Sequence, residues 1–131
     1  MRRVNTAIEG KVYDEVAFDV AAERVAAFRE VFGETRDVVP PTFLTAAEFT
    51  AFPAVIEDPE LALDFTKVVH GDQEYEWRRQ PRVGERLIAR SRIASAKARG
   101  GTAFLTIETE LRDSDGATVA VCRATMIERG E

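Results

Sequence analysis

The sequence predicts an α+β fold in which a curved antiparallel sheet wraps around a short apolar helix. Residues 67–127 contain four strand-like segments separated by short turn sequences. Helical patterns occur only in the N-terminal half, and the segment 42–52 has Glu48 as its one strongly polar side chain. A strongly curved sheet that encloses this helix is one economical solution to that order of elements.

Length and composition indicate a single domain over residues 1–131. The chain is 45% hydrophobic and 31% charged, which suffices for a core without disulfides or metal. The net charge of −5 argues against a nucleic-acid partner and against docking to anionic lipid. Cys122 is the only cysteine, and no segment approaches the roughly 18 apolar residues of a membrane span. We therefore expect a soluble, cytoplasmic protein with no membrane partner.

The N-terminal half is predicted to begin with a strand and a helix. Residues 12–20 alternate, with Val16, Phe18 and Val20 on one side. Residues 21–32 have apolar side chains at helical spacing, followed by a glycine.

Two further helices are expected after the proline pair at residues 40–41. Thr45 and Glu48 have the spacing of a capping box, which would open a helix that Pro53 closes. Asp58-Pro59 is typical of a third helix start.

The C-terminal half is predicted to be an antiparallel meander of four strands. Its strands are expected at 67–79, 87–97, 103–111 and 118–127, with tight turns at 100–101 and 113–116. In the first strand, Val69, Tyr75 and Trp77 are expected to share one face.

Three segments in this order carry a family resemblance: Val39-Pro-Pro-Thr-Phe43, Val69-His-Gly-Asp-Gln-Glu-Tyr75 and Pro81-Arg-Val-Gly-Glu-Arg-Leu87. On these motifs, the chain from about Lys11 to Ile127 resembles the MaoC-like dehydratases of the N-terminal type. That group includes the non-catalytic subunits of actinobacterial (3R)-hydroxyacyl-thioester dehydratases. The resemblance implies a hotdog fold that pairs edge to edge with a second hotdog, with the acyl-thioester site between the two.

The usual catalytic pair of this family is absent. The resemblance implies that catalytic members place an Asp-x-Asn-Pro-x-His segment before the buried helix. The matching residues 33–40 contain neither histidine nor Asn-Pro, and Asp37 stands there without its partner.

His70, the only histidine, is the candidate general acid or base. In a functional interpretation it forms a polar pair with Asp72 on one strand face. In the structural alternative it begins a strand and bonds a loop carbonyl.

Aromatic side chains near the apolar helix are candidates for binding an acyl chain. Phe43, Phe49, Phe52 and Phe65 either line a tunnel or fill the core. The expected substrate-binding set is Pro41, Thr42, Phe43, Phe49, Phe52 and Gln73.

Arg78, Arg79 and Arg82 open the densest basic stretch, which continues to Arg92. They either hold the phosphates of coenzyme A or of a carrier-protein phosphopantetheine, or balance nearby glutamates. The sequence has no zinc-binding cluster and no nucleotide-binding glycine motif. No separate cofactor or metal is therefore expected, and coenzyme A or phosphopantetheine would arrive as part of the substrate.

Three hypotheses follow. The first is an acyl-chain-binding subunit of a heteromeric (3R)-hydroxyacyl-thioester dehydratase, or of the reverse hydratase, whose partner carries the Asp/His pair. The second is a self-sufficient homodimeric hotdog hydratase or thioesterase that uses His70. The third is a module that binds an acyl thioester without turning it over.

Overall fold

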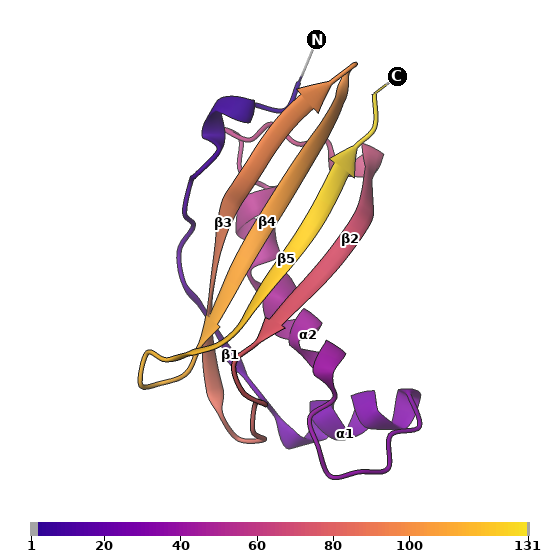
Figure 1. The fold of residues 1–131 in the computed structure, drawn as a ribbon, viewed down its shortest axis with the longest axis vertical. Coiled ribbons are helices and arrows are strands. Elements are labelled where there is room, and N and C mark those ends of the chain that lie inside the picture. Colours follow the sequence, from indigo (N-terminus) through magenta and orange to yellow (C-terminus); the bar gives the residue numbers. More distant parts are fainter. Residues whose placement is uncertain (1–2, 131) are drawn as a thin grey trace.

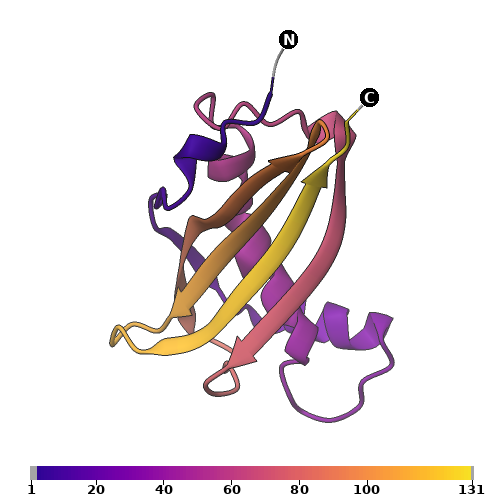
Figure 2. The same cartoon turned by 45° about the horizontal axis from the view of Figure 1, so that its top comes forward.

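A five-stranded antiparallel sheet curves around short helices in the computed structural model, which describes residues 3–130 (Figure 1). The strands are β1 (Val16–Asp19), β2 (Val68–Trp77), β3 (Arg86–Arg99), β4 (Thr102–Arg112) and β5 (Thr118–Glu128). The helices are α1 (Ala22–Val31), α2 (Leu44–Thr50) and α3 (Phe52–Ile56), with single 3-10 turns at Thr6–Ile8, Pro41–Phe43 and Phe65–Lys67. The turned view shows α2 lying against the concave face of the sheet (Figure 2). The predicted fold class is confirmed.

The hairpins β3-β4 and β4-β5 agree with the sequence pattern. Gly100 and Gly101 form the first turn with φ of +58° and +82°, a conformation that favours glycine. In the second turn, a carboxylate oxygen of Asp113 accepts a bond from the Ala117 amide at 3.0 Å. Alternate residues of β4 are fully buried, as the period of two predicts.

The predicted four-strand meander is wrong in one connection. The sheet order is β1-β3-β4-β5-β2, so β2 pairs with β5 and not with the strand that follows it. Both sides of β3 are already taken, by β1 and β4. Residues 78–85 therefore cross from one side of the sheet to the other, and β2 becomes an edge strand (Figure 1).

A β-bulge at Gly71 corrects the predicted faces of β2. The register with β5 shifts between His70 and Asp72. Before the bulge, Val68 packs on the core, and after it Tyr75 packs on the core. Val69 therefore lies on the outer face, opposite Tyr75, because one extra residue exchanges the two faces of a strand.

The apolar segment around α2 differs in detail from the prediction. Pro53 lies in the first turn of α3 and does not close a helix. The capping box is absent, because α2 has no side-chain cap and Thr45 bonds to Tyr75 instead. Asp58 starts a turn and binds Lys11 at 2.8 Å, so the third predicted helix does not form there.

In α1, Val25 is buried, but only part of the predicted apolar face is covered. Phe28 packs against the core, whereas Phe32, beyond the last helical residue, is 66% exposed. No helix among residues 3–130 is long and apolar enough to cross a membrane.

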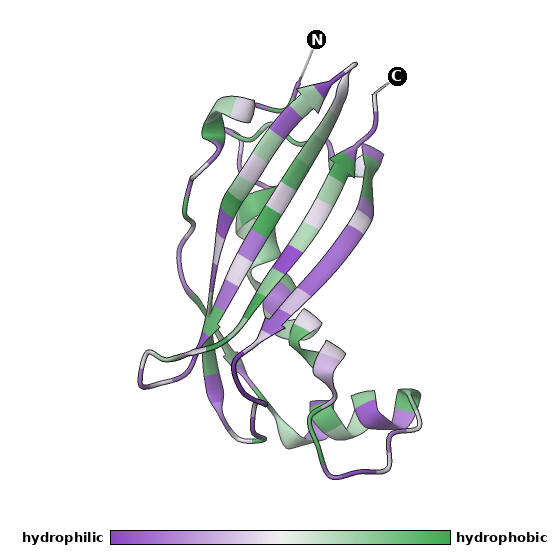
Figure 3. Ribbon diagram, in the orientation of Figure 1, coloured by the Kyte–Doolittle hydropathy of each residue, from purple (hydrophilic) through white to green (hydrophobic). Residues whose placement is uncertain are grey.

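The outer face of the sheet is mostly polar and the inner face apolar, which appears as alternating bands along the strands (Figure 3). Ion pairs run across it from Glu74 to Arg123 at 2.9 Å, from Arg123 to Glu108 at 2.9 Å, and from Arg92 to Glu108 at 2.9 Å. The inner face buries two apolar clusters around α2 and α3.

Candidate functional site

Helix α2 contacts the edge strand β2 through three side-chain pairs. The hydroxyls of Thr45 and Tyr75 are hydrogen bonded, and the Gln73 amide donates to a Glu48 carboxyl oxygen at 3.0 Å. The ring of Phe49 lies 6.1 Å from the ring of His70. Residues three and four apart on a helix share a face, and here that face meets the inner side of β2.

Glu48 is the one charged side chain that is fully buried among residues 3–130. Burial raises its pKa to about 7, although the bond from Gln73 opposes that rise. One oxygen of Glu48 and the amide oxygen of Gln73 are both buried without a hydrogen-bond donor. A proton on that Glu48 oxygen would turn it from an unpaired acceptor into a hydrogen-bond donor.

Sequence reasoning missed Glu48, which it assigned to a capping box. The available signal was its position as the only strongly polar residue of the segment 42–52. A carboxyl inside an apolar helix has to be buried with a partner or exposed, and here the partner is an amide.

An apolar pocket of about 380 Å³ lies beside this contact line. It is lined by Phe49, Phe52, Pro53, Ile56, Phe65, Val68, His70 and Met126. Its volume falls in the range of small-molecule sites, which are mostly apolar with few polar groups. The structure thus brings together three residues of the predicted site, His70, Phe49 and Phe52.

His70 and Asp72 are not brought together. The cross-strand partner of His70 is the buried Met126, whereas that of Asp72 is Thr125, on the other face of β5. The bulge at Gly71 separates them, so His70 faces the pocket and Asp72 faces the outside.

Phe43 lies apart from the pocket, in the core. It is 2% exposed, and its ring centroid is 5.5 Å from that of Phe28 and 6.0 Å from that of Phe18. Thr42 is exposed on the 3-10 turn before α2.

Pro41 lines a second hollow of about 290 Å³, together with Val39, Trp77, Arg78, Arg79 and Gln80. This hollow adjoins the start of α2 and the end of β2.

The three arginines proposed for phosphate binding differ in availability. Arg79 is held by Glu85 and by Asp113 at 3.2 Å, and these bonds raise the pKa of its guanidinium. Arg78 is 59% exposed and lies 3.4 Å from Glu76. Arg82 is exposed.

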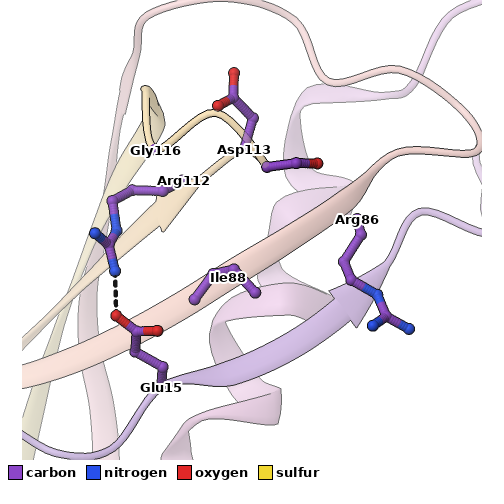
Figure 4. A pocket seen from close by; sticks show the side chains of 7 residues that line it. Glu15, Arg86, Ile88, Arg112, Asp113 and Gly116 are labelled. Carbon is purple, nitrogen blue, oxygen red and sulfur yellow. Dashed lines mark hydrogen bonds and ion pairs between the residues drawn. The ribbon is translucent and has the colours of Figure 1, made fainter.

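Farther along the basic stretch, the arginines are paired with carboxylates. A polar hollow near β1 shows the same kind of pairing, with Arg112 of β4 bonded to Glu15 across it (Figure 4). Arg86 lines the same hollow and bonds to Asp19 at 2.9 Å. These cations already have their counter-ions within the chain.

Residues 3–130 contain no group of three or more His, Cys, Asp or Glu side chains that could hold a metal ion. Cys122 is buried on β5, and burial raises the pKa of its thiol. Its position agrees with a core residue.

The family model described as "FAS1-like, dehydratase domain region" matches residues 7–122. A UPF0336 protein of Streptomyces coelicolor is 32% identical over 143 residues, covering 96% of this chain and 95% of that protein. A UPF0336 protein of Saccharopolyspora erythraea is 35% identical over 112 residues, covering 86% of this chain and 68% of that protein.

Two solved structures show the same fold. One is a C-terminally truncated HadBC (3R-hydroxyacyl-ACP dehydratase) complex from Mycobacterium tuberculosis, with a TM-score of 0.77 at 20% identity over 92% of this chain and 96% of that chain. The other is a MaoC-like dehydratase, with a TM-score of 0.79 at 15% identity over 95% of this chain and 43% of that chain. The fold is therefore the hotdog.

Proposed function

This chain belongs to the MaoC-like hotdog family matched by the FAS1-like dehydratase-region model, and on that premise we propose that it is the acyl-chain-binding subunit of a heteromeric (3R)-hydroxyacyl-thioester dehydratase. The proposed substrate is an acyl thioester of coenzyme A or of an acyl carrier protein, in cytoplasmic fatty-acyl metabolism. A second hotdog subunit supplies the catalytic Asp/His pair.

The observation that carries this proposal is the apolar pocket against the edge strand β2. Phe49 and Phe65 are 42% and 54% exposed there, which leaves aromatic surface for a hydrocarbon chain. The pocket adjoins the free side of the sheet, where a second subunit would meet this one. An acyl chain bound between the two would bury these rings.

The need for a partner comes from the chemistry. Loss of water requires one group to take the α-proton and another to protonate the leaving hydroxyl. Residues 33–40 lack the Asp/His motif, and His70 faces the pocket with Asp72 on the opposite face of β2. This chain therefore offers a binding surface but only half of an acid–base pair.

The carrier phosphates would bind at the exposed arginines. Arg78 and Arg82 are accessible at the end of β2 and in the connection to β3. Arg79 shapes this connection through its bonds to Glu85 and Asp113. Its role in this scheme is to position the loop that presents the two exposed cations.

The test is hydration of a medium-chain trans-2-enoyl-coenzyme A, followed by loss of the enoyl absorbance. We expect the purified chain alone to be inactive and to gain activity with a hotdog subunit that carries Asp-x-Asn-Pro-x-His. Phe49→Ala should raise the KM of the complex for long acyl chains. The matched control is Phe32→Ala, an exposed ring directly after α1 that should leave KM unchanged.

A second function is favoured by the position of His70 in the pocket. In that case the chain is a self-sufficient hydratase or thioesterase, active alone and inactivated by His70→Ala. If the chain binds the acyl thioester but stays silent with every Asp/His subunit, the non-enzymatic binding module is the better description.

A further inference from the structure

The outer edge of β2 is long and uncovered. β2 has ten residues, and its only partner strand among residues 3–130 is β5. No segment lies along its other side in either view of the fold (Figures 1 and 2). An uncovered edge of this length presents unpaired backbone donors and acceptors, which is a template for another strand.

The outward side chains along this edge are acidic. After the bulge, Asp72, Glu74 and Glu76 point away from the helices, and all three are exposed. Glu74 is bonded to Arg123 at 2.9 Å, but its side chain remains 61% exposed. Arg123 also pairs with Glu108 at 2.9 Å and lies 3.9 Å from Glu76, so its charge is shared among three carboxylates.

Two copies of this chain would repel each other if they paired along this edge. A twofold axis makes the two β2 strands antiparallel, and residues of like face lie opposite one another. If Glu74 faces its own copy, Asp72 faces Glu76 on both sides of the axis. A shift by two residues brings Asp72 opposite Glu74, or Glu74 opposite Glu76. Like charges directly opposite one another destabilise strand pairs.

We propose that the outer edge of β2 binds, antiparallel and edge to edge, a protein strand with lysine or arginine at alternate outward positions, and that it rejects a second copy of this chain. This rests on the proposed function, because that strand would belong to the catalytic hotdog subunit. The proposal adds the chemistry that selects the partner. Charge complementarity of this kind fixes both the register and the choice of partner.

Apolar groups adjoin the acidic row at one end of the edge. Val69 is 41% exposed on the outer face before the bulge, whereas Trp77, at the other end, shares the inner face with Tyr75. The outer neighbours of Val69 are Ile127 and, one strand farther, Phe104, which is 39% exposed. An apolar patch that adjoins a charged strip is the arrangement of a protein interface rather than of a solvated strand.

A charge-reversed variant of this chain can serve as the basic partner in a binding test. Asp72→Lys, Glu74→Lys and Glu76→Lys are combined in one variant, and molar mass is measured by analytical ultracentrifugation for each protein alone and for their mixture. We expect wild type and variant to be monomeric separately and to form a one-to-one complex when mixed. The complex should weaken about tenfold or more at high salt. Trp77, the only tryptophan, reports burial of this edge by its emission.

A matched control moves the same charges elsewhere. Glu23→Lys, Glu30→Lys and Asp115→Lys change three exposed acids on α1 and in the β4-β5 turn. This variant should not bind wild type. Circular dichroism checks that both triple variants are folded.

A milder variant keeps the test decisive if the triple one is unfolded. Asp72→Lys alone alters none of the ion pairs described above and places lysine opposite Glu74 or Glu76 of a second copy. It should therefore dimerise with itself, at least tenfold more tightly than wild type. A wild-type dimer with a shifted Trp77 emission would overturn the proposal, as would a mixture and an Asp72→Lys variant that both stay monomeric. Either result leaves the dehydratase role to be judged separately by the hydration assay.

Discussion

The two edges of the sheet are built in opposite ways. β1 has four residues, and Phe18 on its inner face is 4% exposed. Beyond β1, the preceding chain continues along β3, where the Tyr13 amide donates to the Ser91 carbonyl at 2.9 Å and the Gly10 amide to the Ile93 carbonyl at 2.8 Å. β2 has ten residues, an uncovered outer side and two exposed apolar side chains.

The two edges differ in how far contacts within the chain hold and cover them. β1 is held by apolar burial and by its pairing with β3, and the segment that precedes it bonds to the next part of the β3 edge. β2 is held from the inside by β5 and by the pairs that Thr45 and Glu48 make with Tyr75 and Gln73. Its outer side is uncovered, and in the arrangement we propose it pairs with another molecule, so that one edge of the sheet contributes to stability and the other to association.

The largest expected difference between the edges is in their aromatic side chains. Phe18→Ala removes a buried ring that contacts Phe43 and should lower the free energy of unfolding by about 3–5 kcal/mol. Trp77→Ala, at the end of β2, should cost the isolated chain only about 1 kcal/mol. Urea unfolding followed by circular dichroism measures both. Equal losses would contradict the view that the β2 edge is unfinished.

Glu48→Gln tests how the ionisation of Glu48 affects the stability of the contact between α2 and β2. Burial raises the folded-state pKa of Glu48 to about 7 from an ordinary value of 4.5. Its contribution is therefore fully present below about pH 4.5 and is lost as the pH rises through 7. At about 1.4 kcal/mol per tenfold change in the proton equilibrium, the loss by pH 8 is on the order of 3 kcal/mol.

Glutamine mimics the neutral acid, so the variant should not share this loss. The measurement is the difference in unfolding free energy between wild type and Glu48→Gln from pH 4.5 to 8, which cancels the titration of the other carboxylates. The variant should become the more stable protein at high pH. A constant difference across this range would mean that Glu48 is ionised in the folded protein.

The smallest expected effect concerns the hydroxyl pair at the start of α2. Thr45→Val and Tyr75→Phe each remove one partner of that bond, and the double variant removes both. The double-mutant cycle should give a coupling of about 1 kcal/mol. A coupling near zero would show that apolar packing alone holds this end of β2 against the helix.

Local patterns predicted much of this fold. Three features depend only on neighbouring residues: the alternation in β4, the two turns that contain glycine, and the apolar helix. They are where the pattern places them. The pairing of β2 with β5 could not be read in the same way, because it depends on which strand edges remain free after β1 has paired with β3.

The candidate site was predictable in composition more than in geometry. The aromatic side chains near α2 and the lone histidine pointed to the region that forms the pocket. The separation of His70 from Asp72 depends on one extra residue in the ladder, which no periodicity reveals. The contact of Glu48 with β2 was not predicted, because its spacing from Thr45 matches a capping box. In the structure both side chains have partners on β2 instead.

The bulge at Gly71 has a genetic consequence. Deleting this single codon would not simply shorten the strand, because the residues on one side of the deletion would exchange faces. Either the acidic row would turn toward the helices, or His70 and Val68 would turn away from the pocket. A deletion of one residue in the connection at 78–85 leaves every strand in register. Insertions and deletions should therefore accumulate in that connection during evolution, while the length of β2 is kept.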